Sequence, residues 1–472
     1  MDKYKKYIKH NIHTVRLNES IYKTKINDTY YIIKDFKTTD DDLFYETIRE
    51  NSILPKLNHP NIINVIDQFI YDSCIYMVLP YIKYSLYDLE LQNRNQGKHF
   101  TDVQTSKIIN GVLDGLFYLH EHGICHRDLK PDNIMVMEDF TPIIIDFGSC
   151  KNLSVKNTTT VSTCYYRAPE IAGFVLQRTS KSYNEKIDIW GLGCIVYELF
   201  TNKQLTSLDG DSDSGADDES IDYDDSEVFE TDNERTETDD TDETDDEDYT
   251  DETDNESRTT ADDEKDNDYI VRDLFRKLGV PEQHILDKFK LRRYVESDMD
   301  PAKKPIDYFK QCITDEKKLD FIVKLLNINP DKRATMEQCY SSAYINRPPP
   351  KITKIPTDTE VIALQPGKFN MIIYQNDFKR IMKKMKPYGI SEKTLMKSKR
   401  LGLLYMSRYK HRVPDSCLSV VIGACMYMCG NLMDGCSMYK SDYIDNSDTN
   451  ETKFNKVLID VIHKTMGDVY MV

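Results

Sequence analysis

Several patterns that stabilise small secreted or metal-binding proteins are missing from this 472-residue chain. Its 11 cysteines form no CxxC pair and no Cys/His spacing typical of a zinc site. We therefore expect reduced thiols in an intracellular compartment, the cytoplasm or the nucleus, or those of a host cell if the protein is viral. Cys125, Cys150 and Cys164 flank the motifs described below, and we interpret them as packing residues.

The sequence also lacks a recognisable secretory signal and a clear membrane span. The first residues, "MDKYKKYIKHNIH", are charged and have no apolar centre. The most apolar stretch, "CLSVVIGACMYMCGNLM" at 417–433, is about long enough to cross a bilayer. Its serine, its two glycines and Asn431 favour a buried core helix instead, so we expect no membrane association.

Negative charge is concentrated in one segment. Residues 208–268 hold 31 Asp and Glu and three basic residues, which leaves a net charge of about +10 on the remaining chain. The segment has few large apolar side chains, so it cannot offset the entropy cost of ordering, and we predict a disordered acidic insert. It would act as a decoy for basic substrates or a target of acidophilic kinases, or serve only as a solvated loop. The mildly basic remainder is compatible with acidic or phosphorylated ligands. No direct nucleic-acid binding is indicated.

Hydrophobic periodicity divides the rest of the chain. Residues 14–82 alternate β-rich runs such as "YYIIKDF" with one helical stretch, which predicts a small sheet carrying a helix. Residues 101–206 are mainly helical in pattern, with two short strand-like runs, "NIMVM" and "PIIIDF". "KIDIWGLGCIVYELF" at 186–200 is apolar nearly all round, which predicts a fully buried helix. Residues 347–369 contain the linker-like "RPPPKITKIP", and 370–472 form a separate helical unit.

The stretch "CHRDLKPDNIMV" at 125–136 has a high density of charged and polar residues immediately before a strand-like apolar run. Phosphoryl transfer needs such groups: a carboxylate for the hydroxyl proton, cations for the developing charge and oxygens for Mg²⁺. The stretch matches the signature HRDLKxxN, and "DFG" at 146–148 and "APE" at 168–170 follow in the order and spacing of protein kinases. The chain therefore resembles a eukaryotic-type protein kinase over about residues 14–345, without the insert.

This resemblance implies a bilobal α+β fold, with ATP and Mg²⁺ as cofactors and Ser/Thr residues of proteins as substrates. Asp128 would be the catalytic base, and Lys130, typical of Ser/Thr kinases, would contact the γ-phosphate. Asn133 and Asp146 would bind Mg²⁺, since hard cations prefer oxygen ligands. The alternative interpretation makes Asn133 a loop-capping amide and Asp146 a turn carboxylate.

The resemblance also places the nucleotide. "YIIKDF" fits the strand with the phosphate-pairing lysine, Lys34, and "TIRENSIL" fits the helix whose glutamate, Glu50, holds it. Leu79 would be the gatekeeper. The adenine would be contacted by the hinge and by apolar side chains below and above it, namely Pro80, Ile82, Met135, Leu17 and Ile21.

One kinase feature is absent. The stretch before Lys34, "RLNESIYKTKINDTYYIIK", contains no glycine and is about three residues shorter than the usual GxGxxG loop, which lets backbone amides approach the phosphates. A shortened loop covers the phosphates less well. This leaves open a second class of protein, a pseudokinase scaffold with weak or no catalysis.

The segments "TCYYRAPE" and "ETIRENSIL" resemble those of the CMGC group, and the second is similar to the PSTAIRE helix of cyclin-dependent kinases. In that frame Thr163 would bridge Asp128 and Lys130. Thr158 would be the activating phosphorylation site, or alternatively an unmodified exposed hydroxyl. Its basic partners would be Arg49, Arg127 and Lys151. Glu170 and Arg333 match the family's buried ion pair.

The unit at 370–472 is similar to a single cyclin box, with Gly423 and Ala424 allowing close helix packing. Leu432 replaces the lysine with which cyclins contact the PSTAIRE helix, so an unrelated helical domain is the alternative. If the resemblance holds, kinase and activator share one chain and contact each other within the molecule. We thus divide the chain into an N-terminal extension (1–13), a small lobe (14–82), a large lobe (83–346) with the insert, a linker (347–369) and a cyclin-like all-α domain (370–472).

Overall fold

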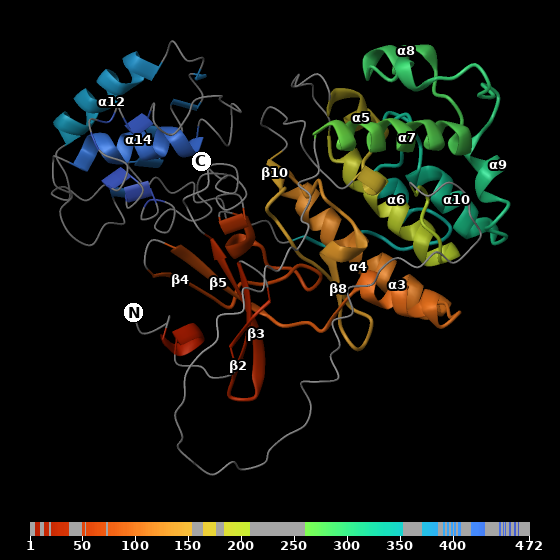
Figure 1. Cartoon of the computed structure of the whole chain (residues 1–472), viewed down its shortest axis with the longest axis horizontal. Helices are drawn as coiled ribbons and strands as arrows, with labels where there is room; N and C mark the ends of the chain where they lie inside the picture. The colour runs from red at the N-terminus through yellow and green to blue at the C-terminus, as the bar shows by residue number, and fades with distance from the viewer. Residues whose placement is uncertain are drawn as a thin grey trace, which may run out of the picture.

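The fold is given by a computed structural model of the chain (Figure 1). Up to the helical C-terminal region it describes residues 5–9, 14–17, 20–36, 50–51, 53–71, 74–152, 164–175, 184–207 and 260–352. Beyond these it describes residues 371–385, 390–391, 394–395, 398–399, 401–402, 405–406, 417–429, 443–444, 447, 449, 453–454, 457–458 and 461.

A five-stranded antiparallel sheet with the order β1-β2-β3-β5-β4 forms the N-terminal part. Its strands are β1 (Val15–Arg16), β2 (Ile21–Ile26), β3 (Thr29–Phe36), β4 (Asp67–Tyr71) and β5 (Cys74–Pro80). Between β2 and β3, Asn27 and Asp28 both have positive φ, the backbone that a tight two-residue hairpin requires and that Asn and Asp tolerate. The expected small sheet is present.

The two faces of this sheet pack differently, because side chains alternate along each strand. On one face Ile33 and Val78 form a cluster with aromatic side chains, and Tyr7 from the single-turn η1 (Lys5–Lys9) stacks on Phe69 with ring centroids 5.8 Å apart. Part of the predicted N-terminal extension therefore covers the sheet. The opposite face faces the main core. Lys34 lies on this face, and its strand partner Met77 belongs to the main core.

The larger helical part is built around α4 (Asp102–Glu121) and α6 (Lys186–Thr201), which contact each other (Figure 1). The residues of α6 from 187 to 199 are buried, as its apolar sequence predicts. The surrounding helices are α3 (Leu86–Asn95), α5 (Pro169–Val175), α7 (Thr260–Leu278), α8 (Gln283–Lys288), α9 (Pro305–Phe309), α10 (Glu316–Leu325) and α11 (Met336–Tyr340). Short strands β6 (Tyr84–Ser85), β7 (Ile124–Cys125), β8 (Ile134–Val136), β9 (Pro142–Ile144) and β10 (Lys151–Asn152) lie between them. Sheet and helices together match the expected bilobal arrangement.

Helix α7 corrects one predicted boundary. It begins at Thr260, so residues 260–268, assigned to the disordered insert, are helical, while 208–259 lie outside the described residues. The reason is a polar anchor that composition does not reveal. Asn267 is buried, and its amide donates to the Ala172 carbonyl oxygen at 3.4 Å and the Tyr294 hydroxyl at 3.3 Å.

In the C-terminal part, α12 (Met371–Met385) packs on α14 (Leu418–Cys429), and both appear in blue in Figure 1. Nearly every side chain of α14 is buried, in keeping with the predicted core helix. Among the described residues, no helix combines the length and apolar character needed to cross a membrane. A Cβ added at Gly423 would overlap Ser447 Oγ, so glycine at this position allows the close approach.

We predict that Gly423→Ala destabilises the C-terminal part by about 1–3 kcal/mol, because the added methyl group overpacks against Ser447. Hydrogen exchange of the α14 amides should accelerate accordingly. Ser419→Ala, on the same helix but only partly buried, is the control and should change exchange little. Unchanged α14 exchange in Gly423→Ala would contradict the packing described here.

Candidate active site

Lys34 on β3 lies beside two carboxylates from distant parts of the chain. Its Nζ is 2.6 Å from Oε2 of Glu50 and 3.9 Å from Oδ1 of Asp146. Glu50 is only 3% exposed, and a charge buried to that extent needs a partner. The structure therefore contains the Lys34–Glu50 pair expected from the sequence and adds Asp146 to it.

The loop 126–133 is fixed by hydrogen bonds to a buried side chain that our sequence reasoning missed. Asp188 of α6 accepts hydrogen bonds from the backbone amides of His126 and Arg127, both at 2.8 Å, and contacts His120 Nε2 at 2.8 Å. Burial alone would raise the pKa of Asp188, but the hydrogen bonds from His120 and the amides lower it below its usual value. The carboxylate thus stays ionised in the core. A charged residue among the mostly apolar residues of α6 was the available signal.

The bonds to Asp188 fix a strained backbone. Arg127 has φ +73°, a conformation that costs free energy for a non-glycine residue and persists only where surrounding contacts enforce it. Two such contacts are hydrogen bonds that Arg127 donates. Its backbone amide donates to Asp188, and its Nε donates to the Ser149 carbonyl oxygen. This strained residue immediately precedes Asp128.

Asp128 and Asn133 both belong to this loop and are directly hydrogen-bonded to each other. The Asn133 amide donates to the Asp128 carbonyl oxygen at 2.7 Å and to its Oδ2 at 3.1 Å. The Ile145 amide donates to the Asn133 carbonyl oxygen at 2.9 Å, which joins the loop to the segment that carries Asp146. Asp128, Asn133 and Asp146 are therefore brought to one place.

The position of Asp146 is set by its neighbour Phe147. Phe147 is fully buried and packs edge-on against the ring of His126, with centroids 5.4 Å apart. His126 Nε2 in turn contacts the Ile145 carbonyl oxygen at 3.0 Å. Asp146 has φ +60° and is 44% exposed, so its carboxylate faces the space beside Lys34.

The oxygens of this site suit Mg²⁺. Asn133 turns its amide hydrogens toward Asp128, so its Oδ1 lies on the other side, and Asp146 offers a half-exposed carboxylate. Among the residues that the structure describes, no group of three or more His, Cys, Asp or Glu could hold a metal unaided. Mg²⁺ commonly uses one or two protein oxygens together with phosphates and water, and Asn133 and Asp146 are two such oxygen donors.

The predicted adenine contacts are placed around the end of β5. Leu79, Ile82 and Met135 are partly buried and pack against the main core, and Pro80 ends the strand. Leu17 is 46% exposed. Its amide donates to the Ile21 carbonyl oxygen at 2.8 Å, and Ile21 lies opposite Lys34 in the strand register.

Several predicted regulatory residues are only partly covered by the structure. Arg127 is buried in the loop described above. The backbone of Lys151 pairs with Cys125, and its side chain lies outside the described residues. Arg49, Thr158 and Thr163 also lie outside them, as does Leu432, so their roles stay predictions.

The expected ion pair between Glu170 and Arg333 is present. Both side chains are buried, and the guanidinium donates to the two carboxylate oxygens at 2.7 and 2.9 Å. The Arg333 guanidinium also lies over the Trp190 ring, 5.0 Å from its centroid. The pair ties the start of α5 to the centre of the helical part.

Cys125 and Cys150 are buried, and burial raises the pKa of both thiols well above the usual value. Cys164 is partly buried. An unreactive thiol in the core fits the predicted packing role.

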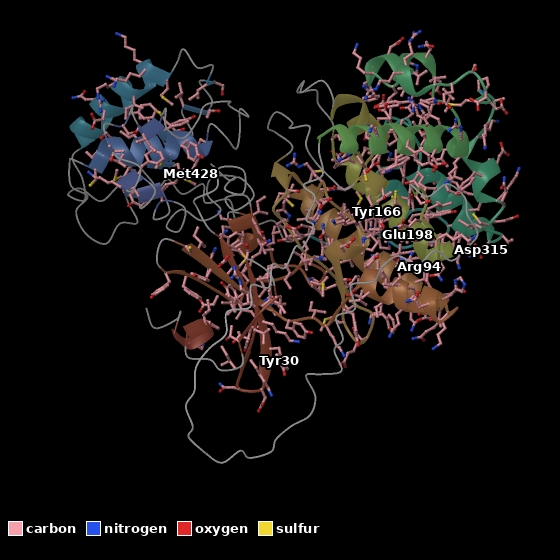
Figure 2. The ribbon with its side chains drawn as sticks, viewed as in Figure 1. Tyr30, Arg94, Tyr166, Glu198, Asp315 and Met428 are labelled. Carbon is pink, nitrogen blue, oxygen red and sulfur yellow. The ribbon has the colours of Figure 1, made fainter. Side chains whose placement is uncertain are left out.

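A second feature missed by the sequence reasoning is a buried carboxyl pair, Glu90 of α3 and Glu198 of α6. Burial raises the pKa of Glu198 to about 7. Hydrogen bonds and the charge of Arg94 act in the opposite direction but are outweighed by burial. Burial and the charge of Glu198 raise the pKa of Glu90 well above its usual value. Figure 2 shows Glu198 near Tyr166 and Arg94. The Tyr166 hydroxyl hydrogen-bonds to Glu198, so the pair lies against the segment before α5.

The family model of the protein kinase domain matches residues 20–345. The chain is 38% identical over 180 residues to a cell division control protein 2 homolog of Trypanosoma brucei brucei, covering 38% of this chain and 55% of that protein. It is 34% identical over 186 residues to a probable cyclin-dependent kinase 8 of Dictyostelium discoideum, covering 37% and 48%. The chain thus spans about half the length of these curated relatives.

Among solved structures, the fold is similar to a chain in the crystal structure of the yeast RNA polymerase II CTD kinase CTDK-1 complex. The TM-score is 0.51 and the identity 20%, over 72% of this chain and 93% of that one. At this identity the likeness bears on the fold alone.

The carboxyl pair predicts a pH dependence of stability. Because the folded protein binds the proton of Glu198 more tightly than the unfolded chain, stability from this group is present below about pH 4.5 and is lost as the pH rises to about 7. In Glu90→Gln the free energy of unfolding should fall less as the pH rises. At pH 8 the variant should be more stable than wild type by about 1–3 kcal/mol. Urea unfolding between pH 5 and 8 measures both effects.

The exposed Glu138→Gln variant is the control and should follow the wild-type curve. If Glu90→Gln and wild type lose stability in parallel over this pH range, the two carboxyls are not coupled as described.

Proposed function

Because the chain belongs to the protein kinase family, we propose that it is a serine/threonine protein kinase, which transfers the γ-phosphate of ATP to hydroxyls of protein Ser and Thr residues. The single observation that carries this proposal is the position of Lys34 between Glu50 and Asp146, with Asp128 and Asn133 joined in the adjacent loop. These are the charges and oxygens that phosphoryl transfer requires.

Each residue has a distinct task in this mechanism. Asp128 orients the substrate hydroxyl and accepts its proton, and Lys130 offsets charge on the transferred phosphate. Lys34, oriented by Glu50, holds the other phosphates. Asn133 and Asp146 would hold Mg²⁺, which when bound would supply the remaining neutralising charge. The backbone around Asp128 is fixed by Asp188, so little reorganisation is needed during the reaction.

The glycine-free sequence at 16–34 favours a second candidate, a pseudokinase scaffold. Without glycine, backbone amides approach the phosphates less closely than in the usual GxGxxG loop. Against it stands the full set of polar groups, since a chain freed from catalysis has no chemical reason to keep Asp128, Asn133 and Asp146 together.

Phosphate transfer to a generic basic substrate separates the two candidates. We expect Mg²⁺- and ATP-dependent incorporation that falls by about 10²-fold or more in Asp128→Asn, because the carboxamide does not accept the hydroxyl proton. The exposed Asp139→Asn variant should retain wild-type transfer. Equal signals from Asp128→Asn and wild type would favour the scaffold.

We also propose that the kinase belongs to the cyclin-dependent type and that its C-terminal part acts as a tethered, cyclin-like activator. The relatives named above, the PSTAIRE-like segment and the small-residue packing of α14 support this assignment. A tether would raise the effective concentration of the activator to about millimolar. The activator would then stabilise Glu50 beside Lys34 without a separate subunit.

Truncation tests this regulation. The fragment 1–348 should transfer phosphate more slowly than the full chain, and added 349–472 should restore the rate in a saturable manner. The same addition to the full chain should have little effect, since its activator is already tethered. Equal rates for fragment and full chain, with no stimulation by 349–472, would exclude activation in cis.

A further inference from the structure

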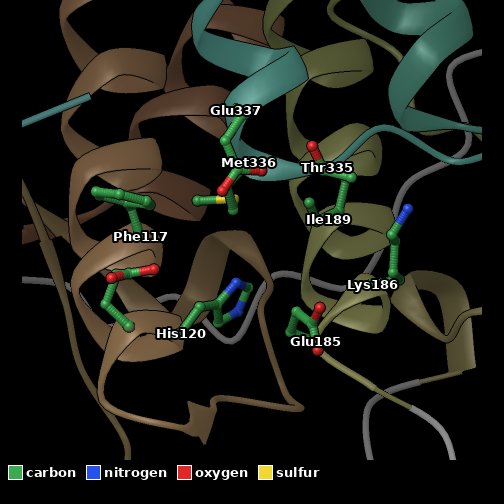
Figure 3. A pocket seen from close by; sticks show the side chains of 9 residues that line it. Phe117, His120, Glu185, Lys186, Ile189, Thr335, Met336 and Glu337 are labelled. Atoms are coloured by element: carbon green, nitrogen blue, oxygen red, sulfur yellow. The ribbon is translucent and has the colours of Figure 1, made fainter. Parts of the chain in front are cut away.

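We propose that the hollow between α4, α6 and α11, on which the mechanism above does not depend, binds a guanidinium group, the side chain of an arginine presented by another protein. Its cavity volume is about 290 Å³, close to the lower limit for ligand pockets and suited to one long side chain. Figure 3 shows this hollow, with α4 on one side and α6 on the other. It is lined by Phe117, His120, Glu121, Glu185, Lys186, Ile189, Thr335, Met336 and Glu337.

The charge of the lining selects a cation. Glu121, Glu185 and Glu337 place three carboxylates around the opening. Hydrogen bonds from its own backbone amide and from Thr335 lower the pKa of Glu337, so this carboxylate is ionised. An anion placed here would face all three, whereas a cation would be attracted by them.

The one lysine of the lining does not cancel this charge. Lys186 Nζ donates to the backbone carbonyl of Arg333, and its charge also acts on Glu185 and Glu337, so one ammonium group stands against three carboxylates. Burial, and then the charge of Arg333, lower the pKa of Lys186. The hollow therefore keeps a net negative charge toward solvent.

His120 provides an independent indication of a ligand. Its side chain is 6% exposed, lines the hollow, and donates from Nε2 to Asp188 Oδ2 at 2.8 Å. In the neutral ring Nδ1 is then an acceptor, and within the described part of the chain it has no hydrogen-bond partner. Figure 3 shows this ring at the centre of the opening, facing Glu185. An N–H donor is the group that the ring lacks.

A guanidinium has both the positive charge that suits the carboxylates and the N–H donors that suit His120 Nδ1. It carries a positive charge and five N–H donors in one plane, so one edge can pair with a carboxylate while another N–H reaches the imidazole nitrogen. A neutral amide supplies donors without the charge. An ammonium supplies charge without the planar array.

The occupant would lie one side chain away from the catalytic loop. A donor to His120 Nδ1 stabilises the tautomer with the proton on Nε2, which is the tautomer that donates to Asp188. Asp188 in turn accepts from the amides of His126 and Arg127. The site is thereby linked to the loop through two residues of the core, His120 and Asp188.

The test uses the full chain labelled with ¹⁵N at histidine and titrated with Nα-acetyl-arginine methylamide. We expect a saturable shift of the His120 ring nitrogens and a dissociation constant at least 10-fold lower than for the matched citrulline derivative, which keeps the shape but lacks the charge. No His120 shift, or equal affinity for citrulline, would overturn the proposal. Equal affinity for the lysine derivative would overturn the guanidinium assignment.

Variants locate the binding. Combined Glu121→Gln and Glu185→Gln should weaken arginine binding at least 10-fold, while the exposed Glu138→Gln, outside the hollow, should bind as wild type. Wild-type affinity in the combined variant would contradict the site. Because the readout is binding at His120, its failure is distinguishable from a failure of phosphate transfer.

Discussion

One buried negative charge organises the active centre. Asp188 lies in the buried helix α6, and its carboxylate accepts hydrogen bonds from the amides of His126 and Arg127 and contacts His120. Removing those partners would leave an uncompensated charge in the core, so helix and loop are ordered together. The strained backbone of Arg127 and the position of Asp128 follow from this constraint.

The sequence could identify groups that are close along the chain or follow a known spacing. Asp128, Asn133 and Asp146 were found in this way, and so was the Lys34–Glu50 pair. Side chains whose role depends on contacts between distant helices were missed. Asp188 and the Glu90–Glu198 pair look like ordinary helix residues until α3, α4 and α6 are assembled.

Composition was a poorer guide than spacing at the end of the acidic insert. The segment 260–268 has few large apolar residues, so hydrophobic reasoning assigns it to disorder, yet it begins α7. Asn267 explains the difference, since it is anchored by hydrogen bonds to Ala172 and Tyr294. Polar anchors of this kind have no periodic signature, in contrast to the buried helix α6.

The proposed function requires that a nucleotide bind beside Lys34, which lies between Glu50 and Asp146. Calorimetric titration of the full chain with ATP at saturating Mg²⁺ tests this most directly. The account predicts saturable binding that weakens at least about 10-fold in Lys34→Met and is retained in Lys25→Met, a lysine at the far end of β2 that pairs with Asp28. Absence of binding by the folded wild-type protein, or equal affinity in Lys34→Met, would contradict it.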